Sequence, residues 1–255
     1  MITLLNGDHW GKEEILTQMY SDDFYYNFLG KNALSSSSLK TLLKSPKTYR
    51  NILNYGDPNS DSPALAAGKL VHWMILESHK IDKLHFVDAT TKNTKVYKEA
   101  KAKYGEVFLT KERSAAERLT DSVLRNEAAI KLLNNSEFEV PEIQMIDGLT
   151  FRGKCDIIQG NTIIDLKTTA ELNTFKYSAD KYGYDLQAWL YLKLFDKKKF
   201  TFLVIDKAST DIGIFETTDE FLARGENKFK QAVDNYKYFF EQDNDLDQYV
   251  MRGIL

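Results

Sequence analysis

The 255-residue chain has a single cysteine, Cys155, and only four prolines. One thiol cannot form a disulfide within the chain, which favours a reducing, cytoplasmic setting. It also excludes an iron–sulfur cluster held by four cysteines of one subunit. No apolar run reaches the roughly 18 residues of a membrane span, and the N-terminus lacks the basic region of a secretory signal. We therefore expect a cytoplasmic protein with no membrane partner.

Neither sign of charge is in large excess, because the formal net charge is only −3. This balance argues against indiscriminate electrostatic binding of nucleic acid, although the distribution of charge matters more than its sum. Basic residues cluster in three places, at Lys40 to Arg50, at Lys92 to Lys103 and at Lys197 to Lys199. Such runs are usually solvated faces; a run that lined a channel would contact phosphates without reading bases.

The length and apolar content predict one α/β domain with a mixed central β-sheet flanked by helices. We expect an N-terminal extension (residues 1–33), a core (34–218), and a C-terminal helix and tail (219–255) whose apolar end docks on this or a neighbouring subunit. The predicted strands are residues 138–146, 149–158, 161–168, 200–206 and 211–217. The predicted helices are residues 62–78, 110–134, 183–195 and 219–242, and residues 54–63 form the clearest loop.

The most informative segment is the predicted strand Thr162 to Thr169, with the sequence TIIDLKTT. Asp165 and Lys167 are two residues apart, so both side chains project from the same face of the strand. Metal-dependent hydrolysis of a phosphodiester needs such a pair, an oxygen ligand for a hard cation and an ammonium beside the attacked phosphate. An isolated D-x-K is nevertheless a weak signal, because most such pairs lie on solvated faces.

The preceding strand adds a second carboxylate, Asp156, near its end. The short turn at residues 159–161 predicts a hairpin whose register brings Asp156 beside Asp165. Two carboxylates and a water can hold Mg²⁺ or Mn²⁺. Taken alone, these residues rather favour a solvent-exposed strand face that carries Arg152, Lys154 and Asp156.

Two predicted helices carry further polar groups. Gln187 and Tyr191 are four residues apart and share one face, where they could clamp DNA, order the carboxylates or form ordinary surface. His72 lies in an apolar helix as a satisfied core group or as a neutral imidazole at a metal or phosphate. Gly68, one turn earlier, costs about 1 kcal/mol relative to alanine, which favours a close approach to the backbone there.

The order G-x-x-x-H, D, D-x-K and Q-x-x-x-Y resembles the PD-(D/E)XK nuclease superfamily with its restriction-endonuclease-like core. Within it, the chain most resembles the RecE (exonuclease VIII) branch of phage recombination exonucleases, relatives of lambda exonuclease. The matching stretches span residues 34–195 and read LSSSSLKTLLKSPKTYR, GKLVH, FRGKCDII, IIDLKTT and YGYDLQAWLY.

The resemblance implies specific roles for these positions. Lys167 would orient or deprotonate the attacking water and stabilise the developing negative charge. Gln187 would support the catalytic group. The implied metal ligands are Asp156, Asp165, the backbone carbonyl of Leu166, His72 and Glu142. The implied DNA-binding residues are Gln187, Tyr191, Arg152, Ser35 and Ser37, although helix capping ahead of Leu39 accounts equally well for the two serines.

The resemblance also implies an activity, a Mg²⁺-dependent deoxyribonuclease in which Mn²⁺ can substitute and no iron–sulfur cluster takes part. It would be a 5′→3′ exonuclease on linear double-stranded DNA that leaves 3′ overhangs for single-strand annealing. Its partners would be DNA ends, further copies of the chain in a ring-like trimer or tetramer, and a single-strand annealing protein. A phage-encoded chain would act in the host cytoplasm. The alternatives are an endonuclease or single-strand nuclease of the same fold, or a catalytically inactive DNA-binding module.

Overall fold

The computed structural model describes residues 1–58 and 63–250, with side chains from residue 66 onward in the second range. Its centre is a five-stranded sheet in the order β5-β6-β7-β8-β9. Neighbouring strands are antiparallel except for β7 and β8, which are parallel, so the sheet is mixed as predicted. Every predicted strand end lies within one residue of the observed one. The strands are β5 (Glu137–Ile146), β6 (Leu149–Gln159), β7 (Thr162–Thr169), β8 (Lys199–Asp206) and β9 (Ile212–Glu216).

One face of the sheet is covered by α5 (Pro63–Leu76) and α7 (Thr110–Arg125). Leu70 and Leu119 from these helices pack with Ile164 and Leu203 of the sheet. The single helix predicted over residues 110–134 is wrong, because the chain forms two helices, α7 and α8 (Glu127–Leu133). Asn126 causes the break: its backbone is extended and its side chain accepts a hydrogen bond from the N–H of Ala129, which caps α8.

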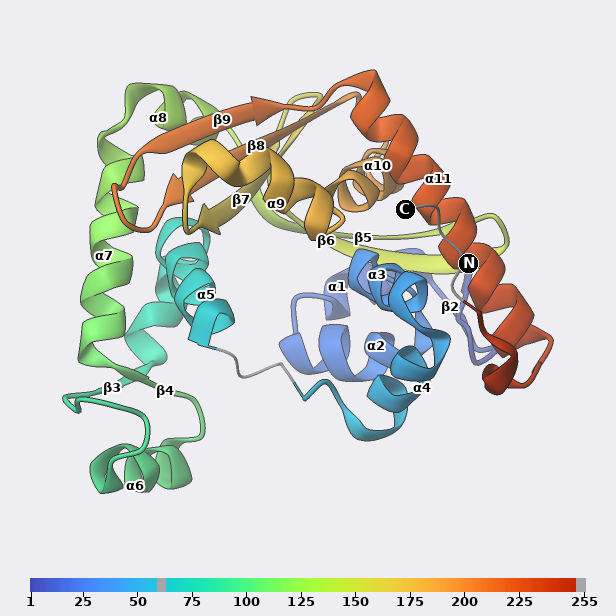
Figure 1. Ribbon diagram of the computed structural model, residues 1–255, viewed down its shortest axis with the longest axis horizontal. Coiled ribbons are helices and arrows are strands. Elements are labelled where there is room, and N and C mark those ends of the chain that lie inside the picture. Colours follow the sequence, from blue (N-terminus) through green and yellow to red (C-terminus); the bar gives the residue numbers. More distant parts are fainter. Residues whose placement is uncertain (59–62, 251–255) are drawn as a thin grey trace.

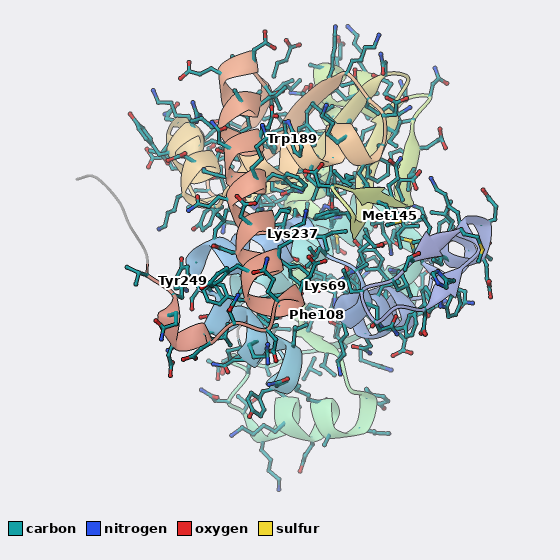
Figure 2. All side chains as sticks on the ribbon, turned by 90° about the vertical axis from the view of Figure 1, so that its right-hand side faces the viewer. Lys69, Phe108, Met145, Trp189, Lys237 and Tyr249 are labelled. Carbon is teal, nitrogen blue, oxygen red and sulfur yellow. The ribbon has the colours of Figure 1, made fainter. Side chains whose placement is uncertain are left out.

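The other face is covered by α3 (Ser36–Lys44), α10 (Tyr184–Leu194) and α11 (Asp219–Tyr236). Trp189 of α10 stacks near Phe229 of α11, with ring centroids 4.6 Å apart, and Figure 2 shows Trp189 beside the long helix. The helix predicted to reach residue 242 is α-helical only to Tyr236 and continues as the π-helical turn η4 (Lys237–Glu241).

The N-terminal residues form a small layer below β5 and β6 (Figure 1). Ile15 and Leu29 pack on Ile143 of β5. Leu34 pairs with Phe151 of β6, and so fills a place beside β6 that β7 does not occupy. The expected extension is therefore joined to the sheet. Its elements are β1 (Ile2–Thr3), β2 (His9–Trp10), α1 (Lys12–Gln18), η1 (Asp23–Phe28) and α2 (Leu29–Asn32), and α4 (Pro46–Tyr55) follows α3.

A projection leaves the body of the molecule beyond α5, as Figure 1 shows. It contains η2 (Ser78–Lys83), β3 (His85–Val87), α6 (Lys95–Tyr104) and β4 (Val107–Leu109), with β3 and β4 parallel. The short elements η3 (Leu172–Thr174), α9 (Phe175–Lys181) and η5 (Leu246–Gln248) complete the fold. Of the helices in the described residues, none has the length and apolarity that a bilayer crossing requires.

Two predicted segments extend beyond the described residues. The predicted loop at 54–63 begins where α4 ends at Tyr55, and residues 59–62 lie outside the described part. In the apolar tail, Tyr249 donates a hydrogen bond to the carbonyl of Leu43 at 3.1 Å, so this part docks on its own chain. Residues 251–255 lie outside the described part.

Candidate metal centre

The site is built where the regular alternation of β6 breaks. Cys155 packs on the α10 side of the sheet, whereas Ile157, two residues later, packs on the α5 side. Regular strand alternation would place both on one face. Opposite this point in β5, Glu139 has a φ of 51°, a left-handed conformation that is rare for a residue with a side chain. Both irregular positions carry carboxylates, Asp156 and Glu139, and both face His72.

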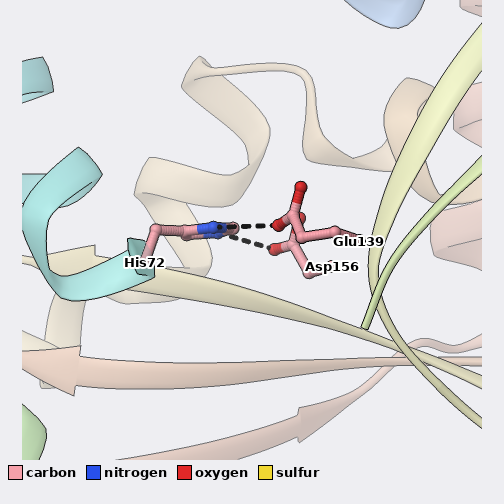
Figure 3. Close-up of side chains that lie close together, drawn as sticks. All are labelled: His72, Glu139 and Asp156. Atoms are coloured by element: carbon pink, nitrogen blue, oxygen red, sulfur yellow. Dashed lines mark hydrogen bonds and ion pairs between the residues drawn. The ribbon is translucent and has the colours of Figure 1, made fainter. Parts of the chain in front are cut away.

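His72, Glu139 and Asp156 offer ligand atoms that all lie within 4.8 Å of one another (Figure 3). His72 Nε2 is 2.9 Å from Asp156 Oδ2, and His72 Nδ1 is 3.4 Å from Glu139 Oε1. An imidazole and two carboxylates are ligand types that Mg²⁺, Mn²⁺ and Zn²⁺ accept in different proportions. This is the one group of three or more such residues with metal-site spacing in the described part of the chain.

Asp165 and Lys167 lie next to this group on β7. Lys167 Nζ is 2.5 Å from Asp165 Oδ2, which confirms that the two side chains share one face of the strand. Gln187 of α10 donates from Nε2 to Asp165 Oδ1 at 2.7 Å, so it orders the carboxylate. The other oxygen, Oδ2, is buried and makes no hydrogen bond of good geometry, although the ammonium is close.

Strong electrostatic coupling ties these groups together. Burial opposes the charge of His72, but Asp156 and Glu139 outweigh it and raise the pKa of His72 to about 10. Burial likewise works against the charge of Lys167, yet Asp165 and Asp156 raise its pKa above the ordinary value. Burial raises the pKa of Asp165. At Asp156 burial acts in the same direction, but His72, the charge of Lys167 and the Leu166 N–H together outweigh it and lower the pKa of that carboxyl.

The hairpin places Leu166 at the edge of the same group. Ile157 lies opposite Ile164, which brings Asp156 beside Asp165 as the sequence predicted. The N–H of Leu166 donates to Asp156 Oδ2 at 2.8 Å. Because the N–H and C=O of one strand residue point toward the same neighbouring strand, the Leu166 carbonyl is directed to the same side as Asp156. This orientation suits the expected role of that carbonyl as a ligand.

His72, Glu139, Asp156, Leu166 and Lys167 line one cleft of about 1160 Å³, whereas Asp165 and Gln187 lie behind its wall. The expected DNA-binding residues Ser35, Ser37, Arg152 and Tyr191 line this cleft with His72 and Lys167. Basic side chains beyond Lys167 and Arg152 also line the cleft. The further basic residues that line it are Lys40, Lys69, Lys80, Lys154 and Lys207.

Several of the wall residues also have structural contacts. Ser35 caps α3, accepting a hydrogen bond from the N–H of Ser38 at 3.3 Å, and its hydroxyl lies 2.8 Å from that of Ser37. Tyr191 is nearly buried and donates to the carbonyl of Lys154. Arg152 donates from Nε to the carbonyl of Leu29 at 3.1 Å. The capping prediction for Ser35 is thus confirmed, and DNA contact by these side chains stays a prediction.

The expectation for Glu142 needs correction. Glu142 lies opposite Gly153 in the β5–β6 register and pairs with Lys12 of α1 at 2.8 Å, away from the metal group. Glu139 takes its place. A signal for it was present, because Asp147 and Gly148 form a two-residue hairpin turn, both with positive φ. Counting outward from this turn places Glu139 opposite Asp156.

The mixed sheet with an Asp–(Asp-x-Lys) site at its centre defines a PD-(D/E)XK-type fold. Residues 35–246 match the model of a family described as a PDDEXK-like domain of unknown function, DUF3799. The chain belongs to this family, which confirms the superfamily resemblance. Members of the PD-(D/E)XK superfamily use divalent metals.

Comparison with solved structures agrees with this fold. A candidate exonuclease from Eubacterium rectale is 17% identical with a TM-score of 0.70, covering 92% of this chain and 95% of that one. A phage-related exonuclease from Haemophilus somnus is 14% identical with a TM-score of 0.36, covering 83% of this chain and 96% of its own. The first likeness shows the fold, and the second is too distant to carry an argument. No curated protein sequence matches the chain significantly.

The residues present fit a divalent cation. The Lys167 ammonium, 2.5 Å away, already compensates the buried Asp165 Oδ2, so the types of ligand atom offered by the neighbouring residues are what favour a cation. The three-residue group supplies two carboxylates and one imidazole beside it. A cation bound there would be held by His72, Glu139 and Asp156, with Asp165 and the Leu166 carbonyl at its edge.

Proposed function

We propose that this protein is a metal-dependent deoxyribonuclease that hydrolyses phosphodiester bonds. The observation that carries the proposal is that Lys167, paired with the buried Asp165, shares one cleft of a PDDEXK-like domain with the His72–Glu139–Asp156 group. Two carboxylates, an imidazole and a retained ammonium in one cleft provide both ligands for a hard cation and a partner for phosphate.

The chain's own residues would act as follows. Lys167 remains an ammonium, since Asp165 and Asp156 outweigh burial and raise its pKa, so it donates hydrogen bonds to the attacking water and to phosphoryl oxygens as their charge grows. Gln187 holds Asp165 in place through its amide. His72 must give up its proton before it can act as a ligand, because a metal binds the neutral imidazole. A bound Mg²⁺ or Mn²⁺ would polarise the phosphoryl group and lower the pKa of a coordinated water.

The finer activity in our proposal is 5′→3′ exonuclease action on linear double-stranded DNA that leaves 3′ overhangs. Its support is the motif resemblance to phage recombination exonucleases together with the exonuclease description of the Eubacterium rectale protein. Ser35, Ser37 and Arg152 would bind the phosphate at the DNA end, since they line the cleft that holds the metal group. Assembly into a ring-like trimer or tetramer and delivery of the overhang to a single-strand annealing protein complete the proposal.

The test is a cleavage assay on linear duplex DNA labelled at either end, with Mg²⁺ or EDTA, beside covalently closed circles. Mg²⁺-dependent release of mononucleotides from 5′ ends, with circles intact, is the expected result. Asp165→Ala should abolish cleavage. Asp234→Asn, which changes an exposed carboxylate on α11, should leave it unchanged.

The other outcomes point elsewhere. Cleavage of closed circles would make the protein an endonuclease, and cleavage of single strands alone would make it a single-strand nuclease. DNA binding without cleavage, by folded protein with Mg²⁺ and with Mn²⁺, would leave a DNA-binding module and overturn the catalytic proposal.

A further inference from the structure

Lys40 reaches the reaction centre from α3, a helix far from β7 in the sequence. Its Nζ donates to Gln187 Oε1 at 3.3 Å, and the amide of Gln187 in turn donates to Asp165. The Lys40 methylenes lie against Gly183, whose absent side chain would meet them at 3.5–3.8 Å. A short chain of contacts therefore links α3 to the Asp165 carboxylate.

Lys40 differs from its neighbouring lysines because it has no carboxylate partner. Lys167 pairs with Asp165 at 2.5 Å, and Lys228 pairs with Asp185 at 2.7 Å. Within the described part of the chain, no carboxylate oxygen lies within ion-pair distance of Lys40 Nζ. Its closest partners are the neutral amide of Gln187 and the face of Tyr184, whose ring centroid is 5.3 Å away.

Lys40 and Lys167 face the same aromatic ring. Lys167 Nζ lies 5.1 Å from the centroid of Tyr184, and Lys40 Nζ approaches the same centroid to 5.3 Å. Both lysines line the metal-centre cleft. Of these two ammonium groups only Lys167 has a carboxylate at ion-pair distance, so within the described residues the positive charge of Lys40 has no direct carboxylate partner.

Burial and the nearby Lys167 disfavour the charged form of Lys40 in the free protein. Burial is the main cause that lowers the pKa of Lys40 to about 8, and the positive charge of Lys167 adds to it. The charged groups that face Lys40 are Lys167 and Asp165 of β7, Asp185 of α10 and Lys228 of α11. An anion beside Lys40 would reverse the cost, because it would stabilise the ammonium.

We propose that Lys40 is a substrate-contact residue that binds a phosphate oxygen of the strand being cleaved, beside the phosphate that Lys167 contacts. Position carries this inference: an unpaired ammonium lies in the cleft, one amide away from Asp165 and on the same ring as Lys167. The inference rests on the proposed nuclease function, and it adds a phosphate contact from outside the hairpin. It also gives α3 a role in the reaction centre beyond the two serines at its start.

Binding of a short linear duplex, measured by fluorescence anisotropy in EDTA over a range of salt concentrations, tests the inference. Lys40→Met should weaken binding about 10- to 100-fold at low salt, the size expected for one charged hydrogen bond. It should also reduce the slope of log affinity against log salt by about 0.9, the value for one lost phosphate contact on duplex DNA. A residue that only positions Gln187 would lower turnover without changing this slope.

The matched control is Lys44→Met, which removes a lysine one turn later on the same helix, exposed and outside the cleft. It should leave the slope unchanged. Lys40→Arg is a second variant that keeps the charge. Because burial lowers the pKa of Lys40 to about 8, wild-type affinity should fall between pH 7 and pH 9, and the arginine variant should resist this fall.

The two proposals fail in different ways. If the wild type binds and cleaves DNA but Lys40→Met keeps its salt slope and affinity, the Lys40 inference alone is overturned. If folded wild-type protein neither binds nor cleaves DNA, the proposed function fails, and the Lys40 inference fails with it.

Discussion

The carboxylate of Asp156 is fixed to the neighbouring strand by the backbone of Leu166, whose N–H donates to Oδ2 at 2.8 Å. The same oxygen faces His72 Nε2 at 2.9 Å. One oxygen thus joins β6, β7 and α5 at the point where the three elements meet. A ligand held on both sides in this way needs little reorganisation to accept a cation, since its direction is already set.

Asp156→Asn should therefore weaken binding of Mn²⁺ by at least about tenfold and reduce cleavage about 100-fold or more. The amide keeps the size of the side chain but removes the negative charge. Calorimetric titration with Mn²⁺ and the end-labelled cleavage assay measure the two effects. The exposed Asp234→Asn is the control. Wild-type metal affinity in Asp156→Asn would remove Asp156 from the ligand set.

Glu139 is a candidate metal ligand whose backbone is in the left-handed region, with a φ of 51°. A non-glycine residue in this region costs on the order of 1 kcal/mol or more, and such strain is often found at functional sites. Glu139→Gly should thus unfold at a higher temperature than Glu139→Gln, because both variants lose the pairing with His72 and only glycine relieves the strain, while metal affinity is lost. Glu139→Gln keeps the strain and should lose metal affinity without any gain in stability.

Thermal unfolding in EDTA and Mn²⁺ titration of both variants measure these effects. A large loss of stability in Glu139→Gly, with stable Glu139→Gln, would mean that the carbon chain of Glu139 supports the fold. Metal affinity unchanged in both variants would show that the cation binds without Glu139.

Asp165 could be predicted as a site residue from the sequence of one strand, whereas Glu139 could not. Strand alternation placed Asp165 and Lys167 on one face, because that inference needs only a period of two within one strand. Glu139 required the register between two strands, counted from the turn at Asp147 and Gly148. The resemblance instead led to Glu142, three residues away, which the register turns toward α1.

Other features depended on contacts that no local pattern contains. Lys40 meets Gln187 across 147 positions of sequence, so a basic run near Lys40 could not be told from a solvated face. The break between α7 and α8 depends on one side-chain cap at Asn126, which interrupts a region with a helical apolar pattern. Local propensity predicted where elements lie, and packing decided which side chains meet.

Gly225 sets the approach of α11 to α10. A Cβ at this position would lie inside contact distance of the carbonyl oxygen of Asp185, a backbone atom that cannot move alone. Gly225→Ala should therefore destabilise the fold by about 3 kcal/mol, despite the better helix propensity of alanine. Chemical unfolding measures this loss. Unchanged stability would show that the two helices can separate at this crossing without cost.

Gly68 is the opposite case. An added Cβ would meet only Thr168 Oγ1 at 3.7 Å, which is an ordinary contact. Gly68→Ala should stabilise α5 by up to about 1 kcal/mol. Because Gly68 lines the cleft one turn before His72, the added methyl group should also weaken DNA binding. Stability and binding measured on the same variant check both effects, and unchanged binding would show that DNA does not approach α5 here.

His72 predicts a pH dependence of stability in the metal-free protein. Its pKa rises from an ordinary value near 6.5 to about 10 in the folded state, because Asp156 and Glu139 outweigh the effect of burial. A raised folded pKa stabilises the protein fully below the unfolded pKa, and the contribution disappears as pH rises through the folded value. In EDTA, wild-type stability should therefore decrease relative to His72→Gln between about pH 6.5 and pH 10.

Urea unfolding at several pH values across this window measures the difference between the two proteins. His79→Gln, which changes an exposed histidine of η2, is the control and should follow the wild-type curve. Added Mn²⁺ should reverse the trend, because ligation requires the neutral imidazole and metal affinity then rises with pH. A wild-type curve parallel to that of His72→Gln in EDTA would mean that His72 is not held as an imidazolium between the two carboxylates.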